Sequence, residues 1–158
     1  MSDAIPTATA AVSDLETHIG FWLRMVSNGI SQAFARRMVE SGVTVAEWVV
    51  LRQLYARDPL TPSALAAELS LTRGAISKLA DRLLAKHLLT RQDSKKDRRY
   101  QSLALTAAGS KLVPQLAALA DRNDSDFFGH LTELERQELK RLMRKLAGEN
   151  SLHSPPMS

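Results

Sequence analysis

The chain has 158 residues, of which 44% are hydrophobic and 24% charged, with a net charge of +4 and no cysteine. This composition is typical of one globular domain, and it excludes disulfide bonds, thiolate zinc sites and cysteine-based peroxide sensing. No apolar run approaches the roughly 20 residues that span a bilayer, which argues against a membrane-spanning helix.

The first predicted helix is long. The segment before it, residues 1–12, has neither a basic start nor a sustained apolar core, so we expect a disordered leader rather than a signal peptide, and a cytoplasmic protein. From Ser13 to about Glu40 apolar residues recur at helical spacing. We expect Ser13 or Asp14 to cap this helix and Gly42 to end it.

Three shorter helices are predicted next. Thr44, with Glu47 three residues later, forms a capping box that starts the first of them. Thr61 and Pro62 predict the start of a short helix, as cap and first helical residue. Thr72 caps a third, whose apolar stripe is Ile76, Leu79 and Leu83.

A hairpin and two further helices complete the chain. Residues 88–92 and 100–105 are predicted to be short strands on either side of the polar tip DSKKDRR. Thr106 starts a helix in which Pro114 predicts a bend or a break. Thr132 opens the last helix, which carries an apolar stripe of its own.

Positive charge is concentrated in one part of the chain. Residues 72–99 hold nine lysines and arginines against three aspartates, a charge of +6, so the rest of the chain sums to −2. A cationic segment on an otherwise mildly acidic protein is typical of a surface that binds a polyanion, and nucleic acid is the leading candidate.

The basic segment begins with a helix-turn-helix. In this motif the second helix enters the major groove and its first residues contact base edges. Any one exposed side chain there is most simply a solvated helix face, but the set lies directly before a basic hairpin. We therefore predict DNA contacts for Thr72, Arg73, Ser77, Lys78 and Arg82.

The hairpin tip is predicted to act as a wing. Lys95, Arg98 and Arg99 are expected to reach phosphates or the minor groove, although Lys95 and Lys96 are also consistent with a solvated loop. Asp97 lies between these cations. We expect it to orient a neighbouring arginine, which solvation alone does not require.

The sequence resembles the MarR family of bacterial winged helix-turn-helix transcriptional regulators. The resemblance is carried by the wing sequence DSKKDRRYQSLALTAAG and, upstream, by TVAEWVVLRQL and SALAAELSLTRGAISKLADRLLAKHLL. It covers roughly residues 14–147. One departure is His87, where the family commonly has glycine at a left-handed helix end; histidine tolerates this conformation at about 1 kcal/mol.

The resemblance implies a fold class and a function. The fold is mainly α with a small β-hairpin wing. The function is that of a homodimeric regulator of a palindromic operator, usually a repressor, and often one that a small aromatic or phenolic ligand releases from DNA. With this family in view, residues 13–147 are predicted to form one unit and residues 148–158 a disordered tail.

The two ends of the unit are expected to dimerise. Residues about 13–41 and 107–147 would supply dimerisation helices around a winged helix-turn-helix of about 44–106. Their apolar faces either pack together within one subunit or are buried against a second copy. We favour the second arrangement because long helices at both chain ends need a partner surface.

A ligand pocket in this family commonly lies between the dimerisation helices and the DNA-binding lobe. The candidates here are His18, Trp22, Trp48 and Arg52. Trp48 and Arg52 are four residues apart and share a helix face, which suits an aromatic carboxylate. The alternative, which we favour, is that Trp48 belongs to the core and Arg52 pairs with a carboxylate.

Two other classes of function compete with DNA binding. The four histidines are scattered without metal-ligand spacing, and the chain has no Gly-rich phosphate loop or nucleophile elbow, so we expect neither an enzyme nor a cofactor. A winged helix used only for protein contacts is the second rival. It predicts no salt-dependent binding to duplex DNA.

Overall fold

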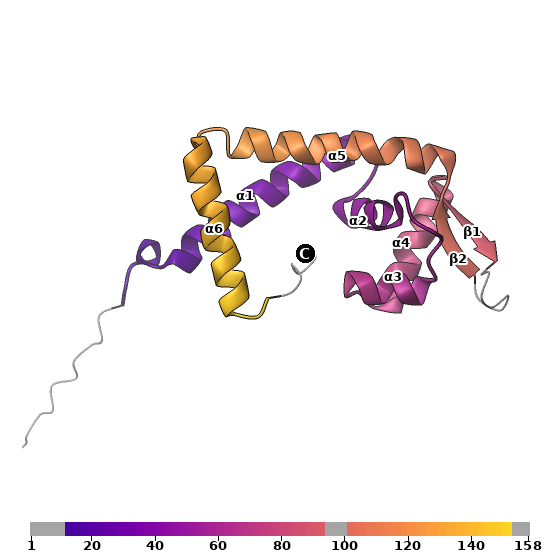
Figure 1. Ribbon diagram of the computed structural model, residues 1–158, viewed down its shortest axis with the longest axis horizontal. Helices are drawn as coiled ribbons and strands as arrows, with labels where there is room; N and C mark the ends of the chain where they lie inside the picture. The colour runs from indigo at the N-terminus through magenta and orange to yellow at the C-terminus, as the bar shows by residue number, and fades with distance from the viewer. Residues whose placement is uncertain (1–11, 94–100, 153–158) are drawn as a thin grey trace, which may run out of the picture.

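The computed structural model describes residues 12–93 and 101–152 as a helical protein with one hairpin (Figure 1). A lobe of three short helices and the hairpin lies at one end, and the last helix lies at the other (Figure 1). Two long helices run between the ends. In these two stretches no helix is both long and apolar enough to cross a membrane.

The first helix is shorter than predicted. A 3-10 turn, η1 (Leu15–Thr17), precedes an extended His18, and α1 spans Ile19–Glu40. Asp14 makes no side-chain cap; instead its carbonyl accepts the Thr17 hydroxyl at 2.6 Å. This local bond closes a separate turn, so the prediction of one helix from Ser13 was wrong.

The end of α1 is as predicted. Gly42 has a φ of +83°, which a residue without a side chain adopts at little cost. Its amide donates to the Val39 carbonyl at 2.9 Å, and the Val43 amide donates to the Met38 carbonyl at 3.2 Å. These two bonds satisfy the last carbonyls of the helix and turn the chain toward the lobe.

The lobe contains α2 (Val45–Leu54), α3 (Pro62–Leu69) and α4 (Arg73–Ala85). Each begins at a predicted cap whose hydroxyl accepts a backbone N–H three residues later: Thr44, Thr61 and Thr72. The capping box of Glu47 is also present. After α4, His87 has a φ of +57°, so the left-handed conformation predicted for it is confirmed.

The hairpin pairs β1 (Leu89–Asp93) with β2 (Gln101–Leu105) in antiparallel register. A third segment, which we did not predict, joins its edge. The Leu60 amide donates to the Leu103 carbonyl at 3.1 Å, and the Leu103 amide donates back at 2.7 Å. Because only one residue, Leu60, pairs with the hairpin, the sequence shows no alternation of apolar and polar residues that would predict a strand there. The pairing nevertheless connects the segment before α3 to the hairpin.

The last two helices are α5 (Ala107–Phe127) and α6 (Glu133–Glu149). Helix α5 continues through Pro114, so the break considered there does not occur. Pro114 has no N–H to donate to the carbonyl of Ser110, four residues earlier. Both residues are exposed, so water can donate to that carbonyl instead. Thr132 starts α6, as predicted, and with Glu135 it forms a capping box that was not predicted.

The core lies inside the lobe and under α5. Its most completely buried large side chains are Met38, Leu51, Leu65, Ile76, Leu83 and Leu116. By contrast, α6 buries none of its residues, and α1 buries only Met38, near its C-terminal end. Large apolar side chains are therefore exposed on both helices: Ile19, Trp22, Leu23 and Val26 on α1, and Leu134, Leu142, Met143 and Leu146 on α6.

Candidate nucleic-acid interface

Helices α3 and α4 form the predicted helix-turn-helix. Ser70 adopts a left-handed φ of +54° at the end of α3, and the Leu71 amide donates to the Ala66 carbonyl at 2.9 Å. The chain then turns sharply into α4, which packs on α3 through Ile76 and other buried apolar residues. The opposite face of α4, including its first turn, is left exposed.

A groove of about 810 Å³ lies between α4, the start of α3 and the hairpin. Nine described residues line it: Thr61, Pro62, Ser63, Arg73, Ser77, Ala80, Arg91, Gln101 and Leu103. None of the nine is acidic. Two guanidinium groups and three hydroxyls in one groove are the donors that phosphate oxygens and guanine edges accept.

The predicted contacts on α4 do not all share this groove. Arg73 and Ser77 line it, and Lys78 is exposed nearby on the same helix. Thr72 is exposed, but its hydroxyl oxygen accepts the Ala75 amide at 3.1 Å, so it already serves as the cap.

Arg82 faces another direction. It lies nine residues after Arg73, which is two and a half helical turns, so the two side chains leave opposite sides of α4. Its positive charge acts on Glu47 of α2. The structure therefore does not bring Arg82 into the groove.

The wing residues lie outside the part of the chain that the structure describes. These are Lys95, Lys96, Asp97, Arg98 and Arg99. The base of the hairpin is described, and there the Arg91 guanidinium pairs with the Asp81 carboxylate at 3.0 Å. This contact joins β1 to the exposed side of α4 and orients the hairpin beside it.

Sequence reasoning missed four polar residues of the groove. Arg91 belongs to the basic segment, and its charge was the signal that could have singled it out. Thr61 and Ser63 begin α3, and a helix start exposes amides that favour phosphate. No local sequence pattern marks Gln101 as a groove residue, because its position in the groove depends on the register of the hairpin.

Lys86 belongs to the basic segment but has a different role. Its ammonium lies 2.7 Å from the carboxylate of Glu47, which is only 1% exposed. Burial raises the pKa of Glu47, but hydrogen bonds from Lys86 and the Thr44 amide, with the charges of Lys86 and Arg82, outweigh it and hold the pKa below its ordinary value. The Lys86 ammonium is thus already paired with a carboxylate of the protein.

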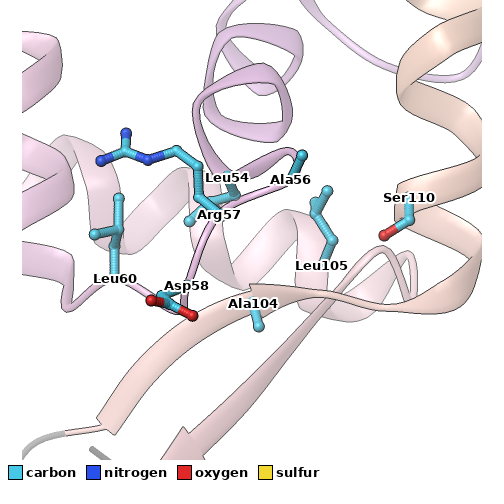
Figure 2. A pocket seen from close by; sticks show the side chains of 8 residues that line it. All are labelled: Leu54, Ala56, Arg57, Asp58, Leu60, Ala104, Leu105 and Ser110. Atoms are coloured by element: carbon cyan, nitrogen blue, oxygen red, sulfur yellow. The ribbon is translucent and has the colours of Figure 1, made fainter.

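A second cavity, of about 720 Å³, lies between the end of α2, β2 and the start of α5 (Figure 2). Figure 2 shows the Arg57 guanidinium directed away from Leu105 and Ser110. Arg57 pairs with Glu68 at 2.7 Å. The polar groups of this cavity do not converge, and none of the predicted site residues that the structure describes lines it.

The four candidate ligand residues lie in two places. His18 and Trp22 are exposed near the start of α1, where the Trp22 indole donates to the Glu16 carbonyl at 2.8 Å. Trp48 and Arg52 lie on α2, in the lobe at the other end of α1 (Figure 1). Trp48 is half-buried against the core and Arg52 is exposed.

Comparison with known proteins connects this geometry to one family. Residues 41–99 match the sequence model of the MarR family. A proposed transcriptional regulator of the hcr operon from Thauera aromatica is 31% identical over 134 residues, which is 84% of this chain and 81% of that protein. The repressor MdtR of Bacillus subtilis is 28% identical over 137 residues, 87% of this chain and 88% of MdtR.

A solved structure agrees with the sequence matches. MepR of Staphylococcus aureus, in its complex with DNA, has a TM-score of 0.71 and 25% identity, covering 84% of this chain and 98% of MepR. The residues that match the family model include seven of the nine that line the groove; Gln101 and Leu103 follow the matched segment.

Proposed function

The chain belongs to the MarR family of transcriptional regulators, and we propose that it works as a homodimeric repressor of a palindromic operator. The observation that carries the proposal is the groove beside α4 that Arg73, Ser77 and Arg91 line. A DNA duplex fits this surface with α4 in its major groove.

Each proposed contact follows from position. Arg73 is the first residue of α4, where the positive end of the helix dipole also favours a phosphate or guanine oxygen. Further DNA contacts come from the first two turns of α4 and the residue before it, through Thr72, Ser77 and Lys78. Arg82 contacts the DNA from the opposite side of α4. Beyond β1, we propose that Lys95, Arg98 and Arg99 reach the backbone or minor groove, with Asp97 as orienter.

The proposal of a dimer rests on the exposed apolar faces of α1 and α6. Ile19 is 75% exposed and Leu134 is 79% exposed, which is unfavourable for side chains of this size in a lone subunit. A two-fold pairing of these helices covers both faces. It also holds two α4 helices apart, so each can enter one half-site of a palindrome.

Selection of genomic fragments by the purified protein tests this function. We expect enrichment of one inverted-repeat sequence, and higher expression of the adjacent gene when the regulator is deleted. Random fragments after selection, or a deletion that lowers expression of the target, would contradict the proposed repressor.

We also propose that an aromatic carboxylate binds beside α2 and releases the DNA. Trp48 and Arg52 lie four residues apart on α2, and the chain has only two tryptophans, Trp22 and Trp48. Benzoate should quench tryptophan fluorescence and weaken operator binding, and Trp48→Phe should remove most of the quenching. Unchanged fluorescence and affinity at saturating benzoate would refute ligand control of this kind.

A further inference from the structure

An ion pair between a buried carboxylate and a partly exposed lysine lies where three elements meet. The Glu47 carboxylate, in the first turn of α2, accepts a hydrogen bond from the Lys86 ammonium at 2.7 Å. The same ammonium donates to the carbonyl of Gly42 at 2.9 Å. Gly42 follows the end of α1, and Lys86 is the C-cap residue directly after α4. We call Gly42, Glu47 and Lys86 the junction cluster.

Both sides of the junction cluster are held in place by the backbone. Glu47 also accepts the Thr44 amide at 2.8 Å, as part of the capping box. Gly42 takes the left-handed conformation that closes α1, and His87 takes the same conformation directly after Lys86. The lysine therefore joins two rigid helix ends rather than two loops.

The hydrogen bonds of the junction cluster constrain the orientation of α4 in a way that the apolar contacts of the core do not. Helix α4 packs on its neighbours mainly through apolar side chains such as Ile76 and Leu83, and such contacts constrain sliding only by shape. Within the described residues, Lys86 makes every side-chain hydrogen bond that joins α4 to α2 or to the end of α1. Hydrogen bonds fix a distance and an angle, which apolar packing does not.

We propose that the junction cluster is a positioning device that sets the angle of α4 on α1, and thereby the separation of the two α4 helices in the dimer. This rests on the proposed function, because separation matters only for a dimer that reads two half-sites. Lys86 and Glu47 touch no DNA in this account. They act through the placement of Arg73 and Ser77 at the far end of the same helix.

A spin-label measurement tests the proposal without DNA. The chain has no cysteine, and a Cβ atom added at Gly74, on the exposed first turn of α4, meets no atom of another part of the protein within 4 Å. Gly74→Cys therefore accepts one label per subunit. We expect a narrow distribution of label-to-label distances in the dimer, and a broad one when Glu47→Gln and Lys86→Met are combined.

The double variant removes both charges together, so no buried charge is left without a partner. A second variant, Lys86→Arg, keeps the charge but changes its reach, and should shift the mean distance rather than broaden the distribution. The matched control is Arg57→Gln with Glu68→Gln, which removes an ion pair between the turn after α2 and α3 that does not include a residue of α4. It should leave the distances unchanged.

Operator spacing supplies a second readout. One base pair inserted between half-sites should weaken wild-type binding about tenfold, but the Glu47→Gln/Lys86→Met protein less than about threefold, since a loosely held α4 can adapt. Affinity for a single half-site should stay within about threefold of wild type. If the double variant only lowered the stability of the protein, binding to the operator, to the operator with the inserted base pair and to the single half-site would fall together.

The outcomes separate the two proposals. A wild-type protein that shows no label-to-label coupling is not a dimer, which contradicts the proposed function itself. A wild-type dimer whose distances and spacing preference are unchanged in both junction variants would overturn only the role of the junction cluster.

Discussion

Arg73, Arg82 and Lys86 are three cations of one helix with three different surroundings. Arg73 lines the groove, Arg82 leaves the opposite side of α4, and Lys86 is bound to Glu47. In the sequence, all three were counted as equivalent positive charges of the basic segment. Only the helical rotation, together with what packs on each side of α4, assigns them different roles.

The first prediction concerns Arg73. Arg73→Ala should weaken operator binding by about tenfold to a hundredfold, the loss expected for one arginine contact to a base or phosphate. Its unfolding midpoint should stay at the wild-type value because the side chain is exposed. Anisotropy titration measures the affinity. Arg122→Ala, which removes an exposed arginine from α5, is the control, and an equal loss there would refute a specific role.

The second prediction concerns the pH dependence of stability. Contacts to Lys86 and Thr44 lower the pKa of Glu47 in the folded protein below its ordinary value of 4.5. The ionised carboxylate therefore stabilises the fold above that value, and this stabilisation is lost as the pH falls through the lowered pKa. Urea unfolding should show Glu47→Gln less stable than wild type by about 1–3 kcal/mol at pH 7.

That difference should shrink as the pH falls through the lowered pKa of Glu47, because protonation makes wild type resemble the variant. Arg57→Gln serves as a comparison, because its ion pair with Glu68 is exposed and contributes little. A Glu47→Gln penalty that is the same at pH 3 and pH 7 would show that the carboxylate's charge is not what stabilises the fold.

At the scale of elements, sequence patterns located most helices well because their starts are chemically explicit. Thr44, Thr61 and Thr72 were predicted as caps and Thr132 as the start of a helix, and all four hydroxyls accept the backbone amide three residues later. The errors came from tertiary context. The bond from Thr17 to the Asp14 carbonyl and the Leu60 edge contact have no pattern that a single sequence displays.

The third prediction concerns the start of α5. A methyl group added at Gly109 would collide with the carbonyl oxygen of Leu88, which is backbone and can move only with the hairpin. Gly109→Ala should therefore destabilise the protein by about 1–3 kcal/mol, as overpacking does. Thermal unfolding measures this.

Gly148→Ala provides the opposite case. Its added methyl group meets nothing within 4 Å, and alanine in α6 should raise stability by up to about 1 kcal/mol. If both substitutions stabilise the protein, the close approach of α5 to the hairpin is not a real constraint.

At the scale of the whole molecule, the sequence identified the apolar faces of the helices at both chain ends, and we favoured their burial against a second copy over packing within one subunit. Helical spacing shows that a face is apolar and not what covers it. The structure leaves the faces of α1 and α6 exposed within one subunit. The groove was predicted only in part, because Arg91 and Gln101 reach it through the hairpin register rather than through a local motif.

The fourth prediction concerns dimerisation. Leu142 and Leu146 are 43% and 48% exposed on α6, and replacing both with glutamate should convert the dimer to a monomer. Sedimentation velocity measures the mass. Operator affinity should then fall to that of a single half-site, since the second contact is no longer linked to the first.

Gln137→Glu adds an acid to an exposed position of α6 without removing an apolar side chain. It should remain dimeric and bind the operator as wild type does. A Leu142→Glu/Leu146→Glu protein that also remains dimeric would place the interface elsewhere.

A competition titration tests the central claim most directly, that this chain reads a DNA sequence through the groove at the start of α4. The selected operator and a scrambled duplex of equal length compete for wild-type protein over a series of salt concentrations. We predict that the operator binds about a thousandfold or more tightly, and that log K falls linearly with log salt by about 0.9 for each phosphate contacted. Equal affinity for the two duplexes, or affinity that does not change with salt, would contradict it.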